Sequence, residues 1–174
     1  MIKEALKIKI QENHKTFLDF ISNLSDDLFV KSKVEKWTAG QQLEHIYLSV
    51  KPVRQALSLP KFLLIILWGK ANRKSRNYDE LVIKYLGKLS NGGKAPTRFI
   101  PDEVHLEKRP KLKELFSKEI SRLNRKIDNF SESELDKFVL PHPLLGKLTF
   151  REMLYFTIYH VEHHQKSIEE ICEP

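Results

Sequence analysis

Two histidines near the C-terminus have the spacing of a metal-binding pair. His160 and His164 lie four residues apart in a segment whose apolar residues recur with the period of a helix, so both imidazoles fall on its apolar side. One helical turn separates them, and two ring nitrogens at that spacing can reach a single ion at about 2.0–2.1 Å, the distance that zinc prefers. A pair is an incomplete site, so the rest of the chain must supply at least one more ligand.

His45 is a third candidate ligand, in a segment that also has the pattern of an amphipathic helix. It lies about 100° from the centre of the apolar stripe of that helix, on a second face of small residues. Small residues around a histidine leave room for a ligand or a cleft, whereas large side chains more often surround a structural histidine. The neighbours of His45 on this face are Leu48, Ser49, Pro52 and Ala56.

His45, His160 and His164 together form a candidate metal site. Three neutral imidazoles with an open fourth position let a divalent ion carry a water or a substrate atom. The alternative is that all three are hydrogen-bonded histidines of the core, because seven histidines in 174 residues give a pair at this spacing some chance of arising without function. Spacing alone leaves both interpretations open.

Apolar periodicity predicts an all-α protein with four long helices and a small helical insertion between the second and the third. The long helices cover Ile2–Leu24, Thr38–Leu57, Leu112–Phe130 and Thr149–Ile171, and the insertion covers Phe62–Trp68 and Tyr78–Leu89. The second and the last begin with a capping box, in which two side chains satisfy backbone N–H groups of the first turn. Pro52 removes one hydrogen bond from the second helix, which predicts a kink or an early end near Lys51. The sequence shows no strand alternation.

Two loops and one further histidine complete the set of candidates. Residues 90–101, with two prolines, are predicted to form an ordered loop that roofs a cleft. Ser131–Gly146 is also predicted as a loop; in it His142 lies between two prolines and either makes hydrogen bonds within the loop or lines the mouth of the site. His14, at the edge of the first apolar stripe, is interpreted as a histidine bonded to a neighbouring helix, with a ligand role in reserve.

The positive charge of the chain raises nucleic acid or an anionic membrane as partners, since the net charge is +7 and the isoelectric point is near 9.4. Its two basic clusters, Lys70–Arg76 and Lys108–Lys113, lack interleaved aromatic residues, which favours solvated loops and helix faces over a stacking surface. Phe62–Trp68 could anchor the protein to a membrane surface, but packing in the core or in a dimer interface is the favoured interpretation. Neither nucleic acid nor a membrane is therefore an expected partner.

The length of 174 residues fits one domain, so residues 1–174 are expected to form a single helical bundle domain. The N-terminus lacks the pattern of a signal peptide, and the longest apolar run is far below the ~20 residues that span a bilayer. The single cysteine, Cys172, cannot form an internal disulfide, which fits a reducing compartment. These features predict a soluble, cytoplasmic protein.

Three segments of the chain, in order, resemble motifs of the DinB-like family of metal-dependent enzymes. They are Trp37–Ile46, Lys94–Pro101, and His142–Thr149 leading into Tyr159–His164. The resemblance implies a four-helix bundle in an up-down-down-up arrangement, often dimeric, with a metal held by the positions that match His45, His160 and His164. His163 occupies a position that varies in the family, and the resemblance assigns it a flanking role.

The activity that the resemblance implies is broad. Members of the family include thiol S-transferases and thiol-dependent isomerases, and others are regarded as metal-dependent hydrolases, so a small-molecule substrate, a divalent metal such as zinc or nickel, and a low-molecular-weight thiol cosubstrate are expected. Such a metal yields a hydroxide or thiolate nucleophile near neutral pH. Glu44 and Glu162 point away from the ligands on their helices, so neither is assigned as general base. The alternative is a non-catalytic bundle that binds nucleic acid or an acidic partner through its basic surface.

Overall fold

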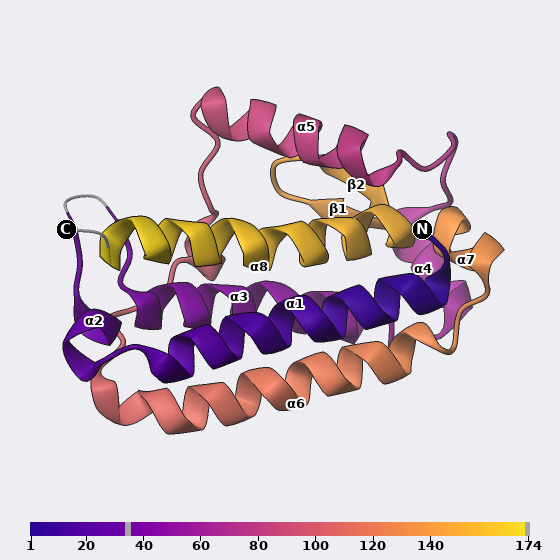
Figure 1. Ribbon diagram of the computed structural model, residues 1–174. Helices are drawn as coiled ribbons and strands as arrows, with labels where there is room; N and C mark the ends of the chain where they lie inside the picture. Colours follow the sequence, from indigo (N-terminus) through magenta and orange to yellow (C-terminus); the bar gives the residue numbers. More distant parts are fainter. Residues whose placement is uncertain (34–35, 173–174) are drawn as a thin grey trace.

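The computed structural model describes residues 1–33 and 36–172, and its architecture is set by four long helices (Figure 1). These are α1 (Lys3–Asn23), α3 (Ala39–Ala56), α6 (Arg109–Ile127) and α8 (Phe150–Cys172). Helices α1 and α8 run in one direction and α3 and α6 in the other, which is the predicted up-down-down-up arrangement. Helix α1 packs against α6 and α8, and α3 packs against the same two, so the four close into a bundle.

The predicted helical insertion lies between α3 and α6. It comprises α4 (Lys61–Trp68) and α5 (Tyr78–Ser90), followed by the short 3-10 turns η1 (Thr97–Phe99) and η2 (Leu106–Lys108). Helix α5 packs along α8 on the side away from α1 (Figure 1). A further short helix, α2 (Asp26–Val30), follows α1. None of the helices in the described part of the chain is long and apolar enough to cross a membrane.

The segment before α8 differs from the prediction of a loop without strands. It contains α7 (Glu132–Lys137) and an antiparallel hairpin of β1 (Val139–His142) and β2 (Gly146–Thr149). Each strand has only four residues, too few for an alternating pattern to stand out in the sequence. Gly146 adopts a φ of 75°, a backbone conformation that glycine takes without steric strain, and this lets the hairpin turn.

Helix α8 is at the centre of the core. Its first nine residues, Phe150–Ile158, are all buried, because α1 and α3 cover one side while α5, α7 and the hairpin cover the other. Most of these side chains are large and apolar, as expected for a helix that is buried all round, and the buried charges of Arg151 and Glu152 are paired within the fold. Phe150 also meets the rings of Phe130 and Phe138, so the start of α8 is fixed by aromatic packing.

Both predicted capping boxes form. The Thr38 hydroxyl accepts from the N–H of Gln41 at 3.1 Å while the Gln41 side chain accepts from the Thr38 N–H at 3.0 Å, and Thr149 and Glu152 exchange the same two bonds.

Helix α3 does not end near Lys51, so the predicted early end at Pro52 is wrong. It continues through Pro52 to Ala56, where Val53 and Ala56 are buried against the bundle and hold the last turn.

Two arginines of the first basic cluster form ion pairs with a buried carboxylate, while Lys70 and Lys74 of the same cluster are exposed to solvent as predicted. Arg73 donates to both carboxylate oxygens of Glu152 at 2.6 and 2.7 Å, and Arg76 donates to the same carboxylate through its backbone and its guanidinium. The Glu152 side chain has no exposed surface. Burial alone would raise the pKa of Glu152, but the bonds from Arg73 and from two backbone N–H groups outweigh it and lower the pKa. The network fastens residues 70–76 to the first turn of α8.

One residue of the second basic cluster, Arg109, is bonded into the fold, while Lys108 and Lys111 are exposed to solvent as predicted. Arg109 donates to the carbonyls of Ser22 and Leu24 at the end of α1, at 3.3 and 2.7 Å, and so satisfies backbone acceptors that the last helical turn leaves free.

Helix α4 is only partly accounted for by core packing. Leu64 is fully buried, whereas Phe62 and Ile66 are exposed.

Replacing Glu152 with Gln is expected to destabilise the fold by about 2–3 kcal/mol, because both arginines lose the carboxylate that neutralises them. The pKa of Glu152 is lowered in the fold. Its contribution to the free energy of unfolding is therefore complete above the usual glutamate pKa and is lost as the pH falls through the lowered pKa of the folded state. Urea unfolding followed by circular dichroism measures the free energy of unfolding of Glu152→Gln and of the wild type. The difference between the two proteins should be largest at pH 7 and smaller at pH 3.

The matched control is Glu114→Gln, which removes an exposed carboxylate paired with Lys118 on α6. Its unfolding midpoint should stay at the wild-type value. Equal midpoints for Glu152→Gln and the wild type would show that the network does not hold the start of α8.

Candidate metal centre

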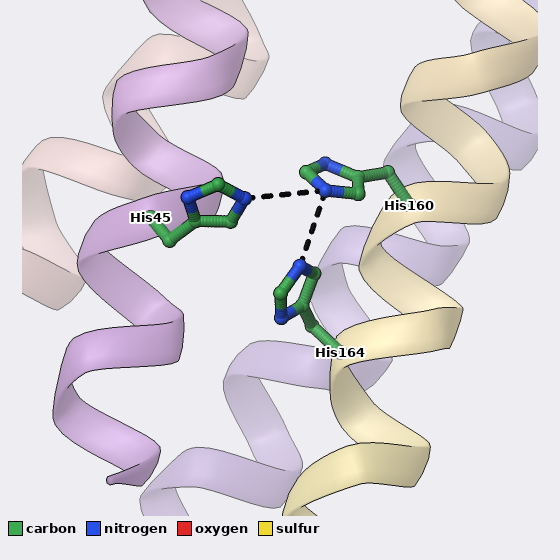
Figure 2. A group of neighbouring side chains, drawn as sticks. All are labelled: His45, His160 and His164. Atoms are coloured by element: carbon green, nitrogen blue, oxygen red, sulfur yellow. Dashed lines mark hydrogen bonds between the residues drawn. The ribbon is translucent and has the colours of Figure 1, made fainter. Parts of the chain in front are cut away.

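The antiparallel packing of α3 against α8 brings the three predicted ligands together (Figure 2). The Nε2 atom of His160 lies 3.3 Å from Nε2 of His45 and 3.1 Å from Nε2 of His164. One ring nitrogen from each residue lies within 4.8 Å of the others. The side chains are 5, 6 and 9 % exposed for His45, His160 and His164, so the cluster lies at the inner end of a cavity rather than on the surface.

The outer nitrogens of two of these rings are held by acceptors. Nδ1 of His45 donates to the Phe99 carbonyl at 2.7 Å, and Nδ1 of His164 donates to Oε1 of Gln42 at 2.8 Å. The orientation of the Gln42 amide is set in turn, because its NH₂ group donates to the Trp37 carbonyl at 3.2 Å. A neutral imidazole has one proton, so Nε2 of both rings carries a lone pair that points at the centre of the cluster.

This arrangement leaves at least one of the three Nε2 atoms without a hydrogen-bond partner in the cluster. His160 has at most one proton on Nε2 and can donate it to only one of the two lone pairs that it faces. A cation at the centre would satisfy all three. Ligand bonds of about 2.0–2.1 Å at tetrahedral angles place ligand atoms about 3.3–3.4 Å apart. The observed separations of 3.3 and 3.1 Å are close to that value, so the donor set fits a divalent metal ion.

Burial keeps these imidazoles neutral. It lowers the pKa of His45, and burial together with repulsion from the neighbouring imidazoles lowers the pKa of His160 and His164 well below the usual value. Metal binding needs unprotonated nitrogens, so the cluster is ready to accept a cation at neutral pH without first releasing protons.

A cavity of about 630 Å³ opens onto the cluster. One wall is the loop around η1, as predicted for a loop that roofs a cleft, and another part of the lining is β1 with the turn that follows it. The small face beside His45 lines it too, through Ser49, Pro52 and Ala56. Most other lining groups are apolar or aromatic. Among the residues that the structure describes, the lining has two charged side chains, Lys51 and Arg98, and no carboxylate.

The remaining histidines lie in different places. His14 is buried on α1, and its Nδ1 bonds to the Ile10 carbonyl of its own helix, so the prediction of a bond to a neighbouring helix is wrong. It is not part of the cluster or the cavity lining. His163 lines the cavity and contacts the rings of His164 and Tyr85. His142 both bonds within its turn and lines the cavity, so its two predicted roles hold together.

Neither glutamate next to a ligand in the sequence lines the cavity, as expected. Glu162 accepts a hydrogen bond from Asn13 on α1, and one oxygen of Glu44 is buried with no partner in the described part of the chain. Gln42 was not predicted as a residue of the site. The residue lies one turn before His45, so a polar side chain at that spacing could have indicated it. The Phe99 carbonyl is a backbone group and leaves no such pattern.

Comparison with known proteins gives one family. A sequence model described as the DinB superfamily matches residues 9–168, a stretch that includes the three clustered histidines and most of the four long helices. Searches of curated proteins and of solved structures found no match.

The metal-free protein is expected to lose stability in mild acid. His160 stays neutral in the fold but gains a proton in the unfolded chain as the pH falls below about 6.5. The free energy of unfolding is therefore highest above about pH 6.5 and falls as the pH is lowered further. Between pH 6 and pH 5, the slope of unfolding free energy against pH should be smaller in His160→Gln by about 1 kcal/mol per pH unit. Urea titrations after dialysis against a chelator measure it, and equal slopes would contradict the burial of a neutral His160.

Proposed function

The chain belongs to the DinB superfamily, and we propose that it is a metal-dependent enzyme in which His45, His160 and His164 hold one divalent ion. The observation that carries the proposal is the convergence of three Nε2 atoms, two of which are fixed as lone pairs by hydrogen bonds at the opposite side of the ring. A hydrogen-bonded core cluster would have paired these atoms with donors instead. Imidazole ligands suit zinc and nickel, and either is proposed here.

The proposed chemistry is activation of a nucleophile at the open end of the cavity. A divalent ion with three neutral ligands keeps its full charge and lowers the pKa of a bound water or thiol toward neutrality. We propose transfer of a thiol, with a low-molecular-weight thiol as cosubstrate, or hydrolysis of a small molecule. The protein's part is to orient the ligands through Gln42 and the Phe99 carbonyl and to keep the reacting groups among apolar side chains that exclude water.

A non-catalytic module that binds nucleic acid is the alternative, and it has less support. Arg73 and Arg76 pair with Glu152, and Arg109 bonds to the end of α1, so part of the basic surface expected for phosphate is used inside the fold. We also propose a cytoplasmic location, because the single cysteine suits a reducing compartment. A homodimer remains a prediction, with the exposed side chains of Phe62 and Ile66 as apolar surface for it.

The first test is metal content. The purified, tag-free protein should contain about one equivalent of divalent metal per chain, and His160→Ala/His164→Ala should contain none, because a single remaining imidazole cannot hold the ion. Inductively coupled plasma mass spectrometry measures both. His105→Ala, which removes an exposed histidine that is not part of the cluster, should keep the wild-type content. A wild type that stays metal-free after incubation with zinc or nickel would contradict the proposal.

Gln42→Ala tests the hydrogen bond that orients His164. It removes the acceptor of the Nδ1 proton, so the ring can turn or carry its proton on Nε2, and zinc affinity should fall about 10- to 100-fold. Competition with a chromogenic chelator measures the affinity. Gln55→Ala, on the same helix but without a bond to a ligand, is the control and should bind zinc like the wild type. Equal affinities for the two variants would remove Gln42 from the site.

A further inference from the structure

His142 has one ring nitrogen fixed as a hydrogen-bond acceptor. It ends β1 between Pro141 and Pro143, neither of which has a backbone N–H. The next two N–H groups along the chain, of Leu144 and Leu145, both donate to Nδ1 of His142 at 3.2 Å. A nitrogen that accepts two hydrogen bonds carries no proton, so the proton of the neutral ring is on Nε2.

The position of the ring is fixed by the hairpin and by α5. His142 pairs with Gly146 across the turn, and Lys84 of α5 donates to the Leu145 carbonyl at 2.8 Å, which anchors the tip. The ring packs against Phe156, with centroids 4.3 Å apart, and Phe156 stacks on His160 at 4.6 Å. His142 therefore faces the cavity one aromatic ring away from the metal centre.

The Nε2–H group of His142 is a donor that the protein leaves unused. In the described part of the chain it has no hydrogen-bond partner, and it is not among the buried polar atoms sealed away from solvent. Burial and the nearby charge of Lys84 lower the pKa of His142 to about 4, so the ring stays neutral above pH 5. The cavity thus contains one fixed neutral N–H donor on a largely apolar wall.

We propose that His142 binds the substrate, through a hydrogen bond from Nε2–H to a carbonyl or carboxylate oxygen of a small molecule with an apolar body. The lining supports this class of ligand, because its described residues are mostly apolar and include two cationic side chains but no carboxylate that would repel an anion. The proposal rests on the proposed function only in taking this cavity as the substrate site.

Two substitutions separate the donor of His142 from its role in the turn. In His142→Asn the side-chain oxygen can replace Nδ1 as the acceptor for Leu144 and Leu145, but nothing replaces Nε2–H. In His142→Gln the amide NH₂ can reach the place of Nε2, but the turn loses its acceptor. The first variant should keep its thermal midpoint and the second should melt at a lower temperature.

Binding is measured by isothermal titration calorimetry on chelator-treated protein, with 4-phenylbutyrate as probe and 4-phenylbutylammonium as the oppositely charged counterpart. The wild type should bind the carboxylate and not the amine. Binding of the carboxylate should weaken about tenfold in His142→Asn, the loss of one hydrogen bond to a charged group, and change less than about threefold in His142→Gln. Because the protein is metal-free, the result does not depend on whether the three-histidine site takes an ion.

Three results would overturn the proposal. They are a long-range ¹H–¹⁵N spectrum that places the His142 proton on Nδ1, equal affinity of His142→Asn and the wild type for the carboxylate, and no binding of the carboxylate by the wild type. Absence of metal from the wild type would instead refute the proposed enzyme and leave these measurements intact.

Discussion

Two hydrogen bonds at the outer nitrogens of His45 and His164 set the chemistry at the inner ones. Each places the single proton of a neutral ring on Nδ1 and leaves a lone pair on Nε2, and the two lone pairs meet the ring of His160 from two sides. Burial also keeps these nitrogens free of an extra proton, because it disfavours the charged form of all three imidazoles and lowers their pKa values. Packing of α3 against α8 thus holds two lone pairs beside one ring nitrogen, which has at most one proton to donate to them.

The fold must hold α8 in register for this to work. His160 and His164 lie eight and twelve residues after Glu152, which is about 12 and 18 Å along the helix axis. Glu152 is both the capping residue of α8 and the carboxylate bound by Arg73 and Arg76, so the same side chain fixes where the helix begins and joins it to the insertion. A shift of α8 by one residue would turn the imidazoles by about 100° and break the cluster.

The sequence predicted the parts of the site that depend on local spacing. The i, i+4 pair of His160 and His164 and the capping boxes are set within one helical turn, so periodicity finds them. The small face beside His45 also indicated the cavity. The contacts that could not be predicted from the sequence are of two kinds. Some join side chains that are distant in sequence, such as Arg73 with Glu152, and others involve backbone groups such as the Phe99 carbonyl, about which the residue type carries no information. The hairpin was missed because two four-residue strands are too short to show alternation.

The described part of the cavity lining contains no carboxylate, which bears on how a nucleophile would lose its proton in this site. Among the described residues the lining has no acidic side chain, and His142 is fixed as a donor, so His163 is the remaining imidazole of the lining outside the three ligands. If the three histidines hold an ion as proposed, its charge would supply most of the shift in the pKa of the nucleophile. A free thiol has a pKa of about 8.5, and a water bound to zinc has a pKa of about 7 against about 15.7 in bulk, so a bound divalent ion would bring either group to its anionic form near neutral pH. Both proposed reactions, thiol transfer and hydrolysis, are therefore consistent with this lining.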